Sequence, residues 1–204
     1  MKDLLIILDN GHGTRAFTKG KCSPDRRIYE GEWARDFVKK LKCAFCNEGF
    51  YTHVLVPEEA DVSLGNRVLR VNTIVKNLDK DKWDVVLLSI HINAAASDDR
   101  WHDARGFSAW IYNKCSKKSE KLGYIFGSEA EMRQLTGNRW IPSEKAHRAN
   151  FKIIRETNCP AVLLENMFQD NKEDVDFLLT EEGKQKLINM YVSAMKTYYS
   201  YINK

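Results

Sequence analysis

Three short, nearly continuous apolar runs, each followed directly by a polar residue, constrain the fold of this sequence most. They are residues 4–8, 83–90 and 161–164. Each run is too short for a buried helix, and its Leu, Ile and Val side chains are typical of strands covered on both faces. Strands of this kind belong mostly to parallel sheets that carry helices on both sides. The sequence therefore predicts an α/β fold.

Amphipathic segments and two further strands complete the pattern. Apolar residues recur at helical spacing in residues 32–45, 64–78, 119–135 and 180–201. Residues 51–56 and 106–112 read as strands, and the alternation in the second places it nearer an edge of the sheet. Because strands and helices alternate, we expect one domain over residues 1–204, built on a twisted, mostly parallel central sheet with helices on both faces.

Composition places the chain among ordinary globular proteins. Of the 204 residues, 43% are hydrophobic and 29% are charged, and no stretch approaches the ~20 consecutive apolar residues of a membrane span. The formal net charge of +4 favours an anionic polymer or surface without identifying one. Five irregularly spaced cysteines argue against a disulfide framework, and the first residues contain no signal-peptide cleavage site. We therefore expect synthesis in a reducing compartment.

Polar residues with catalytic potential follow the three apolar runs. His12, His91 and Glu165 each come just after one of them, and ligands of open α/β sheets bind beyond the carboxyl ends of the strands. Glu30 opens the first helix, where the loop from His12 returns. Two imidazoles and a carboxylate are ligands that catalytic zinc commonly uses. A second, unligated carboxylate would then transfer protons, and we assign that role to Glu165.

Each of these residues also has a structural interpretation. A single histidine after a strand is more often a hydrogen-bonded boundary residue than a metal ligand. Glu30 and Glu32 are also explained as first-turn acids that interact favourably with the helix dipole. A structural role is also favoured for Cys43 and Cys46, because both fall within a predicted helix and no second CxxC motif is present.

Several segments, in this order, resemble one known family. They are ILDNGHG, YEGEWARDFVKKL, VSLGNRVLRVN, LLSIHINAA, GFSAWIY and PAVLLENMFQDNKEDVDFL. Together they are similar to the zinc-dependent N-acetylmuramoyl-L-alanine amidases of the amidase-3 type, which include cell-wall hydrolases and phage endolysins. The resemblance spans nearly the whole chain. It implies one zinc ion per chain, bound by His12, Glu30 and His91, with Glu165 as the catalytic carboxylate.

Helix phase within this resemblance favours Glu30 over Glu32 as the ligand. In the family the ligand glutamate is followed at +7, +8 and +11 by apolar residues, which from Glu30 are Phe37, Val38 and Leu41. Two positions depart from the family pattern. Ala34 stands where the family has asparagine, and Asn10 stands where it has the proline that precedes GHG. The resemblance therefore implies the same ligands with a different outer shell.

The resemblance also implies a reaction, which is hydrolysis of the amide joining the lactyl group of N-acetylmuramic acid to L-alanine. Rival interpretations are a zinc peptidase or amidase acting within the stem peptide, and a non-catalytic peptidoglycan-binding module. Asn93 is expected either to bind substrate or to cap a turn. Trp101 and His102 lie in a polar insertion near the expected site and stay unassigned.

Partners and location follow from the same interpretation. We expect peptidoglycan or a muropeptide as substrate, no nucleic-acid partner, no separate wall-binding domain and a monomer. Without a visible signal peptide, the protein is expected to stay in the cytoplasm until release at lysis, or to reach the cell wall by an export route that the sequence does not reveal.

Overall fold

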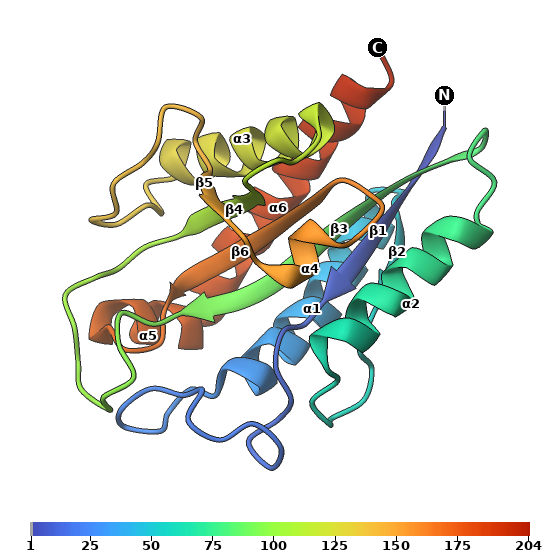
Figure 1. The fold of residues 1–204 in the computed structure, drawn as a ribbon. Coiled ribbons are helices and arrows are strands. Elements are labelled where there is room, and N and C mark those ends of the chain that lie inside the picture. The colour runs from blue at the N-terminus through green and yellow to red at the C-terminus, as the bar shows by residue number, and fades with distance from the viewer. Residues whose placement is uncertain (1) are drawn as a thin grey trace.

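A computed structural model describes residues 2–204 of the chain, within which strands and helices alternate. In chain order the elements are β1 (Asp3–Asp9), α1 (Glu30–Asn47), β2 (Tyr51–Val54), α2 (Leu64–Asn77), β3 (Trp83–Asn93), β4 (Ser108–Tyr112), α3 (Lys117–Met132), β5 (His147–Ala149), α4 (Lys152–Arg155), β6 (Ala161–Phe168), α5 (Lys172–Leu179) and α6 (Glu181–Ile202). The strands form a single sheet with helices on both sides (Figure 1). The predicted α/β fold is confirmed.

The sheet has the strand order β2-β1-β3-β6-β4-β5. From β2 to β6 neighbouring strands are parallel, whereas β4 is antiparallel to β6 and carries β5 parallel to itself at the edge. The three predicted buried runs became β1, β3 and β6, which lie side by side in the centre. Their apolar side chains meet helices on both faces, which explains why these runs do not alternate between apolar and polar residues.

Two hydrophobic clusters fill the spaces between sheet and helices. The larger one joins the sheet to α1, α3, α5 and α6, and the smaller one joins it to α2 and α4. Figure 1 shows α2 and α4 in front of the sheet and α1, α3 and α6 behind it. Only α2 and the short α4 cover the first of these faces, and the carboxyl ends of the parallel strands β1, β3 and β6 lie together at one edge of the sheet.

Several boundaries differ from the predicted ones. Strand β5 and helix α4, of three and four residues, were not predicted, because such short segments contain too few residues to show a period. Strands β3 and β6 were predicted to end before His91 and Glu165, but both continue, to Asn93 and Phe168. They continue because the two strands pair with each other there, with His91 opposite Glu165.

Within residues 2–204, no helix combines the length and the apolar character that a membrane crossing needs.

Candidate active site

The loop after β1 brings His12 toward the end of β3. Gly11 makes the turn with a φ of +60°, and a Cβ at this position would lie 2.9 Å from the carbonyl oxygen of Ile90. Glycine therefore allows both the left-handed backbone and the close approach to β3. Below the turn, the buried carboxylate of Asp9 accepts hydrogen bonds from Ser89 and from the buried guanidinium of Arg67, which fixes the end of β1 against β3 and α2.

Helix α1 holds the same loop from the other side. The guanidinium of Arg35 donates hydrogen bonds to the carbonyl oxygens of His12 and Gly31, and to that of Glu58 before α2. Gly31 allows the loop to lie directly on the helix, since a Cβ there would be 1.8 Å from the carbonyl oxygen of Gly13. The backbone of His12 is thus fixed relative to the first turn of α1.

Glu30, the first residue of α1, lies between the two histidines. Its side chain is 2% exposed. Oε1 is 2.9 Å from His91 Nδ1 and accepts the backbone N–H of Ile92 at 3.1 Å, while Oε2 is 3.6 Å from His12 Nε2. Because a buried carboxylate without a positive partner is costly, this position favours a cation between the three side chains.

His91 and Glu165 are cross-strand neighbours on the face that carries α2. Immediately beyond them, β6 contains a bulge in which Met167 adopts a φ of +69°. Bulges of this kind redirect side chains beside active sites. The side chain of Asn166 donates to the carbonyl oxygens of His91 and Leu164 and accepts from the Tyr191 hydroxyl, so it holds the two strands in register.

Together, His12, Glu30 and His91 form a donor set that fits zinc. One ligand atom from each residue lies within 4.8 Å of the others. The imidazole rings of His12 and His91 are 5.3 Å apart and nearly perpendicular, so they approach a common point from different directions. Two imidazoles and one carboxylate are a usual catalytic zinc set. Glu32, by contrast, lies outside this cluster and pairs with Arg15 at 2.6 Å.

The ionisable side chains of the site shift one another's pKa values. Burial lowers the pKa of His12. Burial also acts to lower the pKa of His91, but the hydrogen bond and charge of Glu30 outweigh it and raise that pKa to about 9. In return, the two histidines hold the pKa of the Glu30 carboxyl below its usual range despite burial. The electrostatics of the site therefore favour an ionised Glu30 next to positive charge.

Glu165 has a different environment from Glu30. Burial raises its pKa to about 7, and its Oε2 is buried with no hydrogen-bond partner among residues 2–204. Its cross-strand neighbour on the other side is Ser108 of β4. A carboxyl group with an unused oxygen, beside the three-residue cluster but outside it, is suited to proton transfer.

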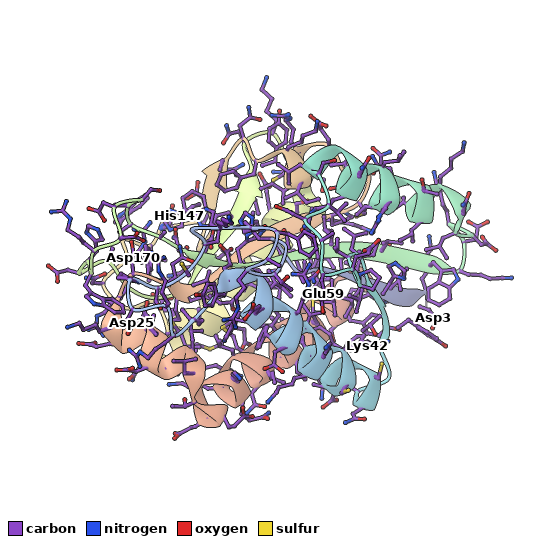
Figure 2. The ribbon with its side chains drawn as sticks, turned by 90° about the horizontal axis from the view of Figure 1, so that it is seen from below. Asp3, Asp25, Lys42, Glu59, His147 and Asp170 are labelled. Atoms are coloured by element: carbon purple, nitrogen blue, oxygen red, sulfur yellow. The ribbon has the colours of Figure 1, made fainter. Side chains whose placement is uncertain are left out.

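A polar groove of about 610 Å³ lies beyond the strand ends. The loop before α1, the loop between β3 and β4, and the residues after β6 line it, including Lys19, Lys21, Asp98, Arg100 and Gln169. The Asp170 carboxylate accepts the backbone N–H groups of Ala95 and Ala96 and so holds one wall of the groove. Asp170 is labelled in Figure 2 near one end of the molecule.

The other residues considered from sequence have structural contacts. Asn93 Oδ1 accepts the backbone N–H of Ala94, which is the turn-capping alternative. Trp101 packs against the larger hydrophobic cluster, and His102 contacts Asp98 at 2.9 Å. Cys43 and Cys46 are exposed on α1.

Sequence reasoning missed Arg35 and Ser108. Arg35 donates a hydrogen bond to the backbone carbonyl oxygen of His12. Because every residue has such a carbonyl, no sequence pattern reveals this contact. Ser108 faces Glu165 only because β4 is antiparallel to β6.

Comparison with known proteins gives a consistent result. A family model described as "N-acetylmuramoyl-L-alanine amidase" matches residues 6–197. The "Probable cell wall amidase LytH" of Staphylococcus epidermidis is 24% identical over 200 residues, covering 98% of this chain and 60% of the relative. The chain thus spans about three fifths of the length of the curated relatives it matches.

Solved structures show the same fold. An N-acetylmuramoyl-L-alanine amidase from Clostridium difficile 630 superposes with a TM-score of 0.77 at 24% identity, covering 98% of both chains. The catalytic domain of CwlV, an N-acetylmuramoyl-L-alanine amidase from Bacillus (Paenibacillus) polymyxa var. colistinus, gives a TM-score of 0.77 at 20% identity, covering 98% of this chain and 99% of the other.

Proposed function

Because the chain belongs to the N-acetylmuramoyl-L-alanine amidase family, we propose that it hydrolyses the amide bond between N-acetylmuramic acid and L-alanine in peptidoglycan. The observation that carries this proposal is the convergence of His12, Glu30 and His91 beside Glu165. A wall substrate is further supported by the similarity to the staphylococcal relative, a probable cell wall amidase.

We assign His12, Glu30 and His91 as the ligands of one zinc ion. Zinc bound by these residues supplies a Lewis acid that polarises the substrate carbonyl and lowers the pKa of water. The protein contributes the fixed positions of the ligands. Arg35 and Gly31 fix the backbone of His12, the first turn of α1 positions Glu30, and Asn166 restrains the strand that carries His91.

Glu165 is assigned the proton transfers. Its carboxylate accepts a proton from the attacking water and returns it to the nitrogen of the departing L-alanine, so that the amine leaves in neutral form. Ser108 lies opposite Glu165 on β4, and Asn166, the next residue of β6, fixes the backbone beside it through hydrogen bonds to the carbonyl oxygens of His91 and Leu164. Asn93 is assigned to the adjoining turn rather than to substrate, because its side chain already accepts the N–H of Ala94.

We further propose that the protein acts as a monomer on the cell wall, which it reaches at lysis or after export. All four assigned residues come from one chain, so the site needs no second copy.

Digestion of purified peptidoglycan, with mass spectrometry of the soluble products, tests the proposed function. Intact stem peptides that begin with L-alanine are expected, and a chelator should abolish their release, with recovery after zinc addition. Shortened peptides would instead show that the protein cleaves within the stem peptide. A protein that sediments with the wall but releases nothing, even with added zinc, would be a binding module and would contradict the proposal.

A further inference from the structure

Four aromatic side chains form a cluster on the surface of the sheet at β4 and β5. The indole of Trp110 stacks on His147 with ring centroids 4.6 Å apart and contacts Phe151 at 5.7 Å, and Trp140 meets His147 edge-on at 5.9 Å. We call Trp110, Trp140, His147 and Phe151 the aromatic cluster. Its members come from β4, the loop before β5, β5 itself and the residue before α4.

Strand register places this cluster next to Glu165. Ser108 lies opposite Glu165, and two residues further along β4 Trp110 lies opposite Leu163 and His147. Cross-strand partners point to the same face, so Trp110 and His147 share the face of Glu165, one row away, or about 7 Å. The indole N–H of Trp110 donates to Ser108 Oγ at 3.0 Å. Figure 2 shows His147 on the side of the sheet that carries α2.

Exposure distinguishes the cluster from ordinary core packing. Trp140 is 74% exposed and Phe151 is 40% exposed, while Trp110 and His147 are half-buried beneath them. Burial lowers the pKa of His147, so this ring is neutral at physiological pH. The cluster therefore exposes uncharged aromatic side chains to solvent, which is typical of a binding surface rather than of the interior.

The proposed substrate is asymmetric about the bond that is cut, with a sugar on one side and a peptide that carries carboxylates on the other. The surroundings of Glu165 are asymmetric as well. The polar groove includes Gln169, which directly follows β6, whereas the aromatic cluster adjoins Leu163, two residues before Glu165. The groove carries charged side chains of both signs, which suits a polar peptide, and the uncharged rings suit the apolar face of a pyranose.

We propose that the aromatic cluster binds the sugar rings of the glycan strand, with Trp140 as the exposed stacking surface. This inference rests on the proposed function, since it uses the sugar of that substrate as the occupant. Axial C–H groups make one face of a pyranose apolar and weakly positive, and the faces of aromatic rings are weakly negative. Binding there places the sugar beside Glu165 with the peptide directed along the groove.

Arg139, the residue before Trp140, places a positive charge near Glu165. Its guanidinium lies 5.3 Å from the ring centroid of Phe168, and its Nε is buried with no hydrogen-bond partner among residues 2–204. Its charge also acts on Glu165. After hydrolysis the sugar side of the cut bond carries the new lactyl carboxylate. An arginine without a carboxylate partner on this side suits that product.

Titration with the peptide-free disaccharide of N-acetylglucosamine and N-acetylmuramic acid tests the assignment. Binding is followed by the indole N–H signals in NMR spectra of the zinc-loaded protein. We expect shifts in the signals of Trp110 and Trp140. Trp140→Ala should weaken disaccharide binding about fivefold or more, equivalent to about 1 kcal/mol, and Trp140→Phe should retain most of it. Tyr124→Ala, which removes an exposed aromatic residue on α3, is the matched control and should bind normally.

Unchanged disaccharide binding by Trp140→Ala would overturn the inference, as would an equal loss in Tyr124→Ala. Titration with free stem peptide is a further test. If the peptide binds at Trp140, the aromatic cluster holds the peptide, and the inference is overturned.

Kinetics separate this inference from the proposed function. Trp140→Ala should raise KM for a disaccharide peptide while leaving kcat unchanged, and should leave KM unchanged for a lactyl peptide that lacks sugar. If disaccharide binds at Trp140 but no amide is cut, the proposed function fails and the sugar site stands. If the amide is cut and Trp140→Ala keeps the wild-type KM, the sugar site fails alone.

Discussion

At the scale of single residues, the four assigned side chains lie close together but have separable roles. We predict that Glu165→Gln keeps zinc and loses turnover by about 10²- to 10⁴-fold, the usual contribution of a general acid–base group. His91→Ala should lose the metal itself. Zinc content of the purified variants and release of stem peptides from peptidoglycan measure the two effects. A Glu165→Gln protein with wild-type turnover would show that another group transfers the proton.

Gly31 is predicted to be intolerant of even one added carbon. In Gly31→Ala the new Cβ would lie 1.8 Å from the carbonyl oxygen of Gly13, so the loop with His12 must move away from α1. We expect a loss of about 1–3 kcal/mol in the free energy of unfolding, together with weaker zinc binding. Gly65→Ala is the matched control in the first turn of α2, because its nearest neighbour would be the flexible Lys152 Nζ at 3.9 Å. Urea titration of both variants measures the difference.

The sequence revealed candidate site residues where a histidine or a glutamate follows an apolar run that is typical of a buried strand. His12, His91 and Glu165 each follow an apolar run, and the structure brings their side chains to one place. Residues whose role depends on a distant partner gave no such signal. Arg35 contacts a loop carbonyl 23 residues away, and Trp140 becomes part of a surface only when its loop meets β5.

At the scale of elements, the sequence predicted the parallel centre of the sheet but not its antiparallel side. The long apolar runs identify β1, β3 and β6, because strands covered on both faces need no polar alternation. The direction of β4 depends on how the chain between β4 and β6 turns back. That segment contains α3, β5 and α4, and the last two are too short to leave a periodic pattern. The topology on this side follows from tertiary contacts.

Asp174 joins three elements and makes the stability of this junction depend on pH. Its Oδ2 accepts the N–H groups of Gly106, before β4, and of Phe168, at the end of β6, while the residue itself lies in α5. Burial raises the pKa of Asp174 from 3.8 to about 6. Because the folded-state pKa is raised, this stabilising contribution is complete below about pH 4 and is lost as the pH rises through about 6.

Asp174→Asn removes this titration while keeping an oxygen that accepts both N–H groups. We predict that the free energy of unfolding of the wild type, relative to the variant, falls by about 2 kcal/mol between pH 4 and pH 7. Urea unfolding of both proteins across this range measures the change. If the difference in the free energy of unfolding between wild type and variant stays constant with pH, Asp174 has the same pKa in the folded and unfolded states.

At the scale of the whole molecule, the proposed zinc ion links α1 to β3 and to the loop after β1. At a free zinc concentration 100 times the dissociation constant, binding should add about 2.7 kcal/mol to the stability of the folded state. For a chain of this size that corresponds to a rise of about 5–10 °C in Tm. Thermal unfolding with zinc and with a chelator measures it. His91→Ala should show no rise, and a wild type indifferent to zinc would contradict the ligand assignment.

Strand β6 is the last strand in the chain, yet it lies between β3 and β4 in the middle of the sheet. During synthesis, β1, β2 and β3 leave the ribosome with half of the sheet unformed, and β4 has no central neighbour until residues 161–168 emerge. Glu165, the proposed general acid–base residue, is on this same late segment. A partly translated chain therefore lacks both the completed scaffold and the carboxyl group proposed to move the proton, and we expect it to be inert until residues 161–168 have emerged.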